Sequence, residues 1–238
     1  MGNENGVWIM HGLDYDDPKC IHNAEELLKF INKVGFIPLF KNEIEGFSVE
    51  EHTVPENWWC GDPEIDPWEW RTIIAGSGNA CYGKFFDKKA GFISKKWLPY
   101  FVNYRRDGYD FEGWWTDGKA SRKQKKIMDI MDNDTEIFSN ILKSNAGFTK
   151  GGEKNFDGVV TSLQMNMYLC VRDFQRKTNK KGEEYGWAVA VYSTPEHLWG
   201  VDYAMKAYDE SPEKSFDRIK KQMKKLYPNV TEKQLSKV

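Results

Sequence analysis

The sequence predicts an α+β fold that is mainly helical, with a winged helix-turn-helix domain behind an aromatic-rich α/β module. Two observations lead to this prediction. Between Lys119 and Tyr192, three helix signals precede two strand signals joined by a Lys-rich loop, which is the element order of a winged helix-turn-helix. Ahead of it, large aromatic residues crowd the segment 58–115. A pair of winged helices in tandem is the alternative architecture.

The third of these helices has the clearest pattern. Its apolar residues fall on one stripe at helical spacing, namely Phe156, Val159, Val160, Leu163 and Met167. A start near Glu153 leaves the opposite face to polar side chains that can reach base edges and phosphates, namely Lys154, Thr161, Gln164 and Asn166. In a winged helix this element enters the major groove of DNA, so this face is the first candidate for nucleic-acid binding.

Two shorter helices are predicted before it. The first spans 124–131 and places apolar residues behind a basic face made of Lys119, Arg122, Lys123, Lys125 and Lys126. The second is expected to begin at a cap on Asp134 or Thr135 and to bury Ile137, Ile141 and Leu142. Gly147 then supplies the left-handed residue that ends a helix. In the Gly-rich turn that follows, Lys150 and free backbone N–H groups suit a phosphate contact.

A β-hairpin is predicted after the third helix. Leu169 and Val171 alternate with Cys170 and Arg172, and the segment 187–192 supplies a return strand. The loop 176–184 between them is the predicted wing. Its Lys180 and Lys181, together with Arg172, complete the predicted DNA contacts. The alternative is that these lysines are merely solvated, because lysine and glycine are common in surface turns.

Composition narrows the class of protein. The chain has 238 residues, of which 29% are charged and 40% hydrophobic, which is typical of a folded globular protein. No apolar run approaches the roughly 20 residues of a membrane-spanning helix. The N-terminus lacks the apolar core of a signal peptide, so a cytoplasmic location is expected. Neither the cysteines nor the histidines have metal-binding spacing, and neither a metal nor a cofactor is expected.

The chain divides most naturally at the segment 109–120, where helical periodicity stops. We expect an aromatic-rich module over 1–115, the winged helix over 116–200 and a C-terminal helical segment over 201–238. Asn23 is expected to cap an N-terminal helix that ends at Gly35. Ser211 is expected to cap a further helix near the C-terminus, with Pro212 as its first residue.

The aromatic segment predicts a ligand pocket or a core. Its rings can stack on bases, although tryptophan is also common in protein cores. Charged residues alternate with these rings, and the candidate pocket residues are Trp68, Arg71, Tyr104 and Arg105. Asp66 and Pro67 are expected to open a helix there. Glu69 then has two interpretations. It is either a general acid/base or the third residue of the helix, whose carboxylate bonds back to the backbone N–H of Asp66 in a capping box.

Three sequence blocks resemble a known family. They are Leu28-x-x-Ile31-x-x-x-Gly35-Phe36-Ile37, the block from Trp68-Glu69-Trp70 to Lys89-Ala90-Gly91-Phe92, and Trp97-Leu98-Pro99-Tyr100. Together with the winged helix they resemble the AlkZ-like winged-helix DNA glycosylases, and more narrowly the AlkZ-related proteins. The resemblance implies duplex DNA, including duplexes that carry damaged bases, as a partner. The glycosylases excise bases with a Gln-x-Asp or Gln-x-Gln motif just after the Gly-Phe turn.

The sequence departs from that motif. The matching positions read Pro38-Leu39-Phe40, and none of these side chains can stabilise a sugar cation or orient water. We therefore expect a DNA-binding protein without the family's catalysis. The second hypothesis is a glycosylase-like hydrolase that uses Glu43 or Glu69. The third is a module that binds a small molecule or a protein, which agrees with the acidic pI of about 6.1.

Overall fold

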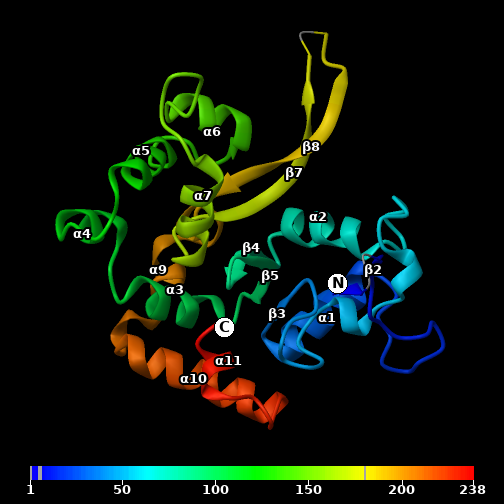
Figure 1. Ribbon diagram of the computed structural model, residues 1–238. Coiled ribbons are helices and arrows are strands. Elements are labelled where there is room, and N and C mark those ends of the chain that lie inside the picture. Colours follow the sequence, from blue (N-terminus) through cyan, green and yellow to red (C-terminus); the bar gives the residue numbers. More distant parts are fainter. Residues whose placement is uncertain (1, 5–6, 180) are drawn as a thin grey trace.

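A six-stranded antiparallel sheet lies at the centre of the computed structural model, which describes residues 2–4, 7–179 and 181–238 (Figure 1). Its strands, in their order across the sheet, are β3 (Phe36–Pro38), β5 (Lys89–Ser94), β4 (Ala80–Phe86), β7 (Cys170–Thr178), β8 (Glu184–Ser193) and β6 (Ile137–Phe138). Two more strands, β1 (Gly2–Glu4) and β2 (Val7–Ile9), pair only with each other.

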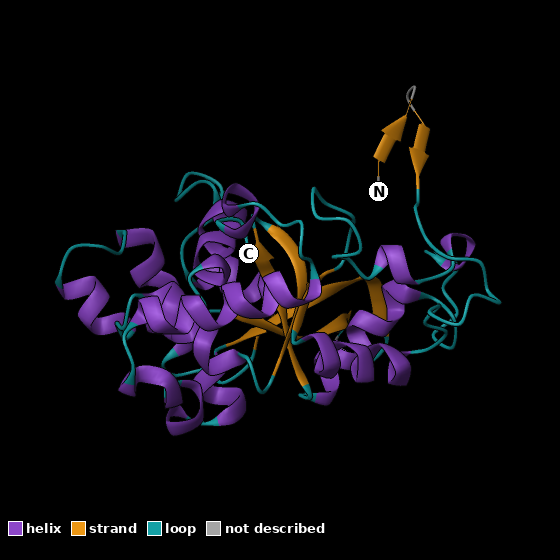
Figure 2. Cartoon of the chain, turned by 90° about the horizontal axis from the view of Figure 1, so that it is seen from below, coloured by secondary structure: helices purple, strands orange, loops and turns teal. Residues whose placement is uncertain are grey.

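Helices surround this sheet (Figure 2). In chain order they are α1 (Ala24–Val34), α2 (Pro67–Ser77), α3 (Leu98–Arg106), α4 (Phe111–Thr116), α5 (Arg122–Met131), α6 (Ser139–Asn145), α7 (Phe156–Met165), α8 (Pro195–Trp199), α9 (Val201–Ala204), α10 (Pro212–Leu226) and α11 (Glu232–Leu235). Short 3₁₀ turns lie at Glu50–His52, Pro55–Asn57 and Lys206–Asp209. The predicted α+β class is confirmed. Within the described ranges, no helix has both the length and the apolar character that crossing a bilayer requires.

Local signals explain where several helices begin. The side chains of Asn23, Ser121 and Ser211 each accept a backbone N–H in the first turn of α1, α5 and α10. At the end of α1, Gly35 adopts a φ of 100°, which explains the glycine there. The helices predicted at these three places are therefore present.

The apolar stripe predicted for the third helix is buried on α7. Phe156, Val159, Val160 and Leu163 all lie in the core, together with α5 and α6. The helix begins at Phe156 and not near Glu153, because Asn155 has a φ of 71° and breaks the helical path. Met167 is also buried, but it lies beyond the end of α7 in a left-handed turn.

The prediction for the second helix was wrong at its start. Ile137 and Phe138 form β6, which pairs with Tyr192 and Val191 of β8, and α6 begins only at Ser139. A sheet partner more than fifty positions away in the chain outweighs the local helical spacing. Ile141 is consequently exposed, whereas Leu142 is buried as expected.

The sheet joins the N-terminal and C-terminal halves of the chain. β4 meets β7 at Tyr82 and Val171, and the hydrophobic cluster around β3, β4 and β5 includes Met167, Cys170 and Val171. α10 packs against α3 and completes the same cluster with Ile219 and Met223 (Figure 1). The core therefore draws on all three of the predicted segments.

Asp66 holds a loop onto the start of α2. Its carboxylate is fully buried and accepts three backbone N–H groups, from Trp68 at 2.8 Å, Trp59 at 3.0 Å and Gly61 at 2.8 Å. One of these bonds caps α2, and the other two fix the preceding loop. The backbone N–H of Asp66 itself donates to the carbonyl of Asp62 at 2.8 Å. Because this N–H is used, the capping box predicted with Glu69 was wrong.

A buried ion pair joins α3 to α8. Arg106 Nη1 bonds to Glu196 Oε1, and Nη2 lies 3.2 Å from Oε2. Nη2 also donates to the carbonyl of Met167 at 2.7 Å, and the guanidinium lies 4.5 Å from the centre of the Tyr168 ring. Arg106 thus connects three separate parts of the chain through charge-assisted bonds.

Candidate nucleic-acid interface

A surface cleft runs beside α7. It has a volume of about 610 Å³, and α7 contributes Thr161 and Ser162 to its wall. Lys84 of β4 and Lys88 of the β4–β5 turn line the same cleft, and neither ammonium group has an ion-pair partner in the described part of the chain. Free ammonium groups beside hydroxyl groups suit phosphate oxygens. The predicted contact residue Thr161 therefore lies in the wall of a cleft that also holds two lysines and the acidic Asp157.

Gln164 does not face this cleft, and the prediction that it points outward was wrong. The residue is only 2% exposed, and its Oε1 accepts the backbone N–H of Lys84 at 2.9 Å. It follows Val160 by four positions, so it lies on the buried side of α7. That spacing was visible in the sequence, but its partner on β4 was not. Gln164 joins α7 to β4 and is not available to read bases.

Other predicted contact residues are exposed. Lys150 and Lys154 lie in the segment between α6 and α7. Lys181 is exposed in the loop between β7 and β8, and its backbone N–H donates to the side chain of Asn179 at 2.8 Å. Lys180, predicted beside it, lies outside the described residues. The loop stands at the end of a hairpin that projects away from the helices (Figure 1).

Arg172 is held by contacts within the protein. Its Nε lies 3.2 Å from a carboxylate oxygen of Glu136, and Nη1 donates to the carbonyl of Ala75 at 3.2 Å and to that of Gly76. These carbonyls end α2, where an arginine is favoured by the helix dipole. The guanidinium therefore joins β7 to α2 and is less available for DNA than the sequence suggested.

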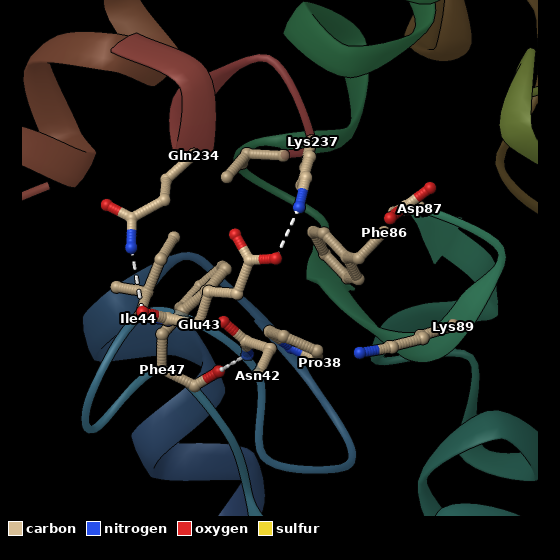
Figure 3. A pocket seen from close by; sticks show the side chains of 11 residues that line it. Pro38, Asn42, Glu43, Ile44, Phe47, Phe86, Asp87, Lys89, Gln234 and Lys237 are labelled. Carbon is tan, nitrogen blue, oxygen red and sulfur yellow. Dashed lines mark hydrogen bonds and ion pairs between the residues drawn. The ribbon is translucent and has the colours of Figure 1, made fainter. Parts of the chain in front are cut away.

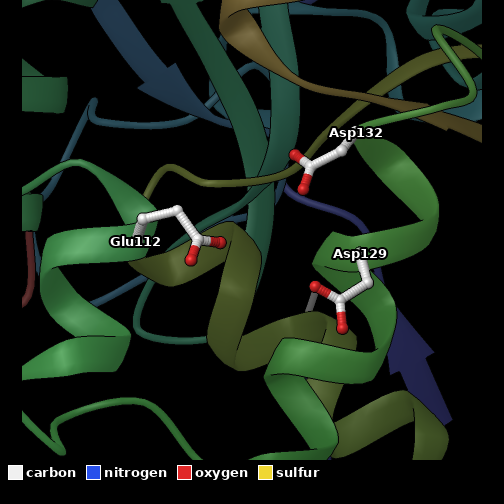
Figure 4. Close-up of side chains that lie close together, drawn as sticks. All are labelled: Glu112, Asp129 and Asp132. Carbon is white, nitrogen blue, oxygen red and sulfur yellow. The ribbon is translucent and has the colours of Figure 1, made fainter.

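The basic face predicted on α5 is largely neutralised. Lys125 bonds to Glu112 and Asp129, and Lys126 lies 2.8 Å from Glu153. Glu112, Asp129 and Asp132 bring their carboxylate oxygens within 4.8 Å of one another (Figure 4). Lys125 already supplies a cation to two of these three exposed groups, so we assign no metal to them.

Glu43, a predicted catalytic residue, lies at the edge of a small cavity of about 60 Å³ (Figure 3). Lys237 Nζ lies 2.6 Å from its carboxylate, and Asn42 and Lys89 line the same cavity. The hydrogen bond and charge of Lys237 lower the pKa of the Glu43 carboxyl. Glu43 is therefore ionised at neutral pH, so it can act as a base but is a poor proton donor.

The positions that match the glycosylase motif contain no polar side chain. Leu39 is fully buried, and the ring of Phe40 lies 5.3 Å from that of Trp58 and 6.3 Å from that of Trp68. Glu69, the second catalytic candidate, is half-buried on α2 and does not line the cavity beside Glu43. The two predicted carboxylates therefore do not share that cavity.

The four predicted ligand-pocket residues fall into two groups. Trp68 and Arg71 lie together on α2, with the guanidinium carbon of Arg71 3.8 Å from the centre of the Trp68 ring. On α3, Tyr104 stacks on Phe216 at 4.2 Å, and Arg105 donates to the carbonyl of Phe85 at 3.2 Å. Tyr104 and Arg105 therefore have structural contacts of their own, while Trp68 and Arg71 remain candidates for binding.

Some candidate residues were missed by sequence reasoning. Lys84 and Lys88 reach the cleft beside α7 only because β4 packs against that helix, and their local sequence gives no sign of it. Phe174 of β7 packs on the other face of the Arg71 guanidinium at 3.9 Å. Trp187 was assigned to a strand, but its 89% exposure could not be foreseen.

A family model described as AlkZ related matches residues 21–238. The chain belongs to the AlkZ-related family. The narrow resemblance seen in the sequence is thereby confirmed over nearly the whole chain. The curated proteins contain no match to this chain. Among solved structures, the chain is similar to the Streptomyces sahachiroi DNA glycosylase AlkZ, with 10% sequence identity and a TM-score of 0.47. That match covers 93% of this chain and 60% of the glycosylase, so this chain spans about 60% of the length of that protein.

Proposed function

We propose that this member of the AlkZ-related family is a DNA-binding protein whose winged helix-turn-helix spans 116–200, and that it lacks the base-excision chemistry of the glycosylases. The observation that supports this most is the cleft beside α7, which Lys84 and Lys88 line together with Thr161 and in which neither lysine forms an ion pair with a described residue. Phosphate contacts from lysine and hydroxyl groups supply most of the affinity of such proteins for DNA. The proposed partner is duplex DNA, including damaged duplexes, and a role in DNA repair follows from this proposal.

The order of elements supports the winged-helix assignment. α5, β6, α6, α7, β7 and β8 follow one another, and β6 pairs with β8 beside the long β7–β8 hairpin. A winged helix has this topology, with the third helix presented to DNA and the hairpin as its wing. The hairpin carries Lys181 together with Tyr185 and Trp187, all exposed. Exposed aromatic rings beside a cation suit contact with a nucleic acid.

The proposed absence of catalysis rests on the motif positions. Pro38, Leu39 and Phe40 offer neither an acid nor a group that orients water, and the Phe40 ring packs among tryptophans. A protein of this kind would recognise DNA without excising bases. Binding of a small molecule or of another protein by the same scaffold is the remaining alternative, because winged helices also serve as protein-binding modules.

Replacing Lys150, Lys154, Lys180 and Lys181 together by alanine is expected to weaken binding to duplex DNA. Each lost phosphate contact should reduce the slope of log K against log salt by about 0.9, because fewer counterions are released. Fluorescence anisotropy with a labelled duplex over a series of salt concentrations measures the slope.

A matched variant controls for net charge. It replaces four lysines of the C-terminal segment by alanine, namely Lys214, Lys221, Lys225 and Lys233, all of which are exposed. This variant should keep the wild-type slope. The fourfold variant of Lys150, Lys154, Lys180 and Lys181 is the variant of the turn and wing. If its slope equals that of the wild type, the proposed interface is contradicted.

The catalytic alternative is tested at Glu43, because this carboxylate lines a cavity and Glu69 does not. We expect no excision of alkylated bases by the wild type above the background of the uncatalysed reaction, and therefore no effect of Glu43→Gln. Release of bases from an alkylated duplex, followed by chromatography, measures this. Turnover by the wild type that Glu43→Gln abolishes would establish the enzyme and refute the non-catalytic proposal.

A further inference from the structure

Arg71 carries a buried positive charge that forms no ion pair with a described residue, although the charges of Glu69 and Asp66 act on it from further away. The residue is 7% exposed, and its guanidinium carbon lies 3.8 Å from the centre of the Trp68 ring and 3.9 Å from that of Phe174. Its Nε is buried without a hydrogen-bond partner, and Nη1 makes one long contact of 3.4 Å with the Thr72 hydroxyl. Most of the hydrogen-bonding capacity of the guanidinium is therefore unused.

An unused buried cation costs free energy, because leaving water is unfavourable for a charge that gains no partner. The two aromatic rings compensate for part of this cost through cation–π attraction. They cover both faces of the guanidinium plane and leave the donors to point along its edge. A guanidinium group held in this way is preorganised to donate two hydrogen bonds to two oxygens of one anion, such as a phosphate.

Tyr82 packs against Phe174, the same ring that the Arg71 guanidinium contacts. This β4 residue is buried, and its ring lies 5.8 Å from that of Phe174. Burial raises the pKa of Tyr82 to about 12, with the charge of Arg71 opposing the rise, so the hydroxyl stays protonated at neutral pH. Within the described chain this hydroxyl makes no hydrogen bond. It can therefore donate to an anion bound at Arg71.

An exposed indole lies next to this pair. The ring of Trp59 lies 6.5 Å from that of Trp68, and Trp59 is 49% exposed although its neighbour Trp58 is buried. The backbone of Trp59 is fixed by its bond to Asp66, so the ring is presented by an ordered loop. The exposed Trp59 ring adjoins Trp68, on whose ring the Arg71 guanidinium packs. The indole and the guanidinium offer two different kinds of contact, one for a planar base and one for its phosphate.

We propose that Arg71, Tyr82 and Trp59 form a binding site for an unpaired nucleotide, with its phosphate at Arg71 and its base on Trp59. The same chemistry occurs in a single strand of DNA and in a free mononucleotide. This site shares no residue with the cleft beside α7 or with the β7–β8 loop. It therefore goes beyond the duplex contacts proposed above, and the two proposals can fail independently.

Isothermal titration calorimetry tests the site with three probes, namely thymidine 5′-monophosphate, thymidine and a short single-stranded oligothymidylate. The nucleotide and the oligonucleotide should bind, and thymidine should bind at least about tenfold more weakly, because it lacks the anion that Arg71 pairs with. Arg71→Gln should weaken binding of both phosphate-bearing probes by about tenfold or more and leave thymidine unchanged. Comparable binding of both phosphate-bearing probes indicates a site for free nucleotides, and binding of the oligonucleotide alone indicates a site for a strand.

Further variants keep the test decisive if Arg71→Gln does not fold. Tyr82→Phe removes one hydroxyl and should weaken binding of phosphate-bearing probes by a smaller factor. Trp59→Ala removes only an exposed ring and should weaken binding of all three probes. Arg218→Gln, which changes an exposed and carboxylate-paired arginine on α10, should leave every affinity unchanged.

Three results would overturn the proposal. They are absence of binding by both phosphate-bearing probes, measurable binding of thymidine with the same affinity as its monophosphate, and wild-type affinities in Tyr82→Phe and Trp59→Ala. The lysine variant of the turn and wing should bind the mononucleotide normally, which separates this site from the proposed duplex interface.

Discussion

Asp66→Ala is expected to lower the free energy of unfolding by about 3 kcal/mol or more, because three backbone N–H groups lose a buried charged acceptor. One of the three hydrogen bonds caps the start of α2, and the other two fix the loop that carries Trp59. Urea denaturation followed by circular dichroism and by tryptophan fluorescence measures the change. The fluorescence of the native state should also change, since the loop beside the tryptophans is released.

Asp110→Ala is the matched control for this substitution. Asp110 caps α4 in an exposed position through a single bond to the N–H of Gly113. Its loss should cost only about 1 kcal/mol, the usual effect of removing a helix cap. If Asp66→Ala destabilises the protein no more than Asp110→Ala, the loop bonds contribute nothing and our account of Asp66 is incorrect.

Glu196→Gln is expected to lower the free energy of unfolding by roughly 3 kcal/mol, because it leaves the buried charge of Arg106 without its counter-ion. The remaining bond of Arg106 to the Met167 carbonyl cannot neutralise that charge. Thermal and urea unfolding at neutral pH measure the loss. The double variant Arg106→Met with Glu196→Gln removes both charges and should recover part of the stability, since no isolated buried charge remains.

The same pair predicts how stability depends on pH. Burial alone would raise the pKa of the Glu196 carboxyl, but the attraction and hydrogen bonds of Arg106 outweigh burial and hold this pKa below its usual value of 4.5. Because the pKa is lower in the folded protein than in the unfolded chain, the stabilisation is complete above pH 4.5 and is lost as the pH falls through the folded value. The stability difference between wild type and Glu196→Gln should therefore shrink in acid. A difference that stays constant below pH 4.5 would contradict this assignment.

Local signals in the sequence predicted the helices well and their tertiary partners poorly. The caps at Asn23 and Ser211 and the stripe on α7 depend on residues within a few positions, so they could be read directly. Ile137 and Gln164 were misplaced because their partners, Tyr192 and Lys84, are remote in the sequence.

The candidate site was predicted in its chemistry more than in its geometry. Tryptophans of the same segment differ widely in exposure, since Trp70 is buried and Trp59 is half exposed, and the residue type alone does not separate them. The sequence paired Arg71 with Trp68 correctly, because three positions on a helix bring two side chains together. The contact of Phe174 with Arg71 could not be predicted from the sequence, because Phe174 lies on a strand in the other half of the chain.

The junction of β4 with β7 at Tyr82 and Val171 has a practical consequence for dissecting the protein. A fragment cut after residue 115 would keep β4 but lose β7, and the complementary fragment would lose β4. Each would then present an uncovered strand edge flanked by apolar side chains, which is a common starting point for intermolecular pairing and aggregation. Fragments of this chain should consequently be less tractable than the full chain, and point substitutions are the better way to assign roles to its parts.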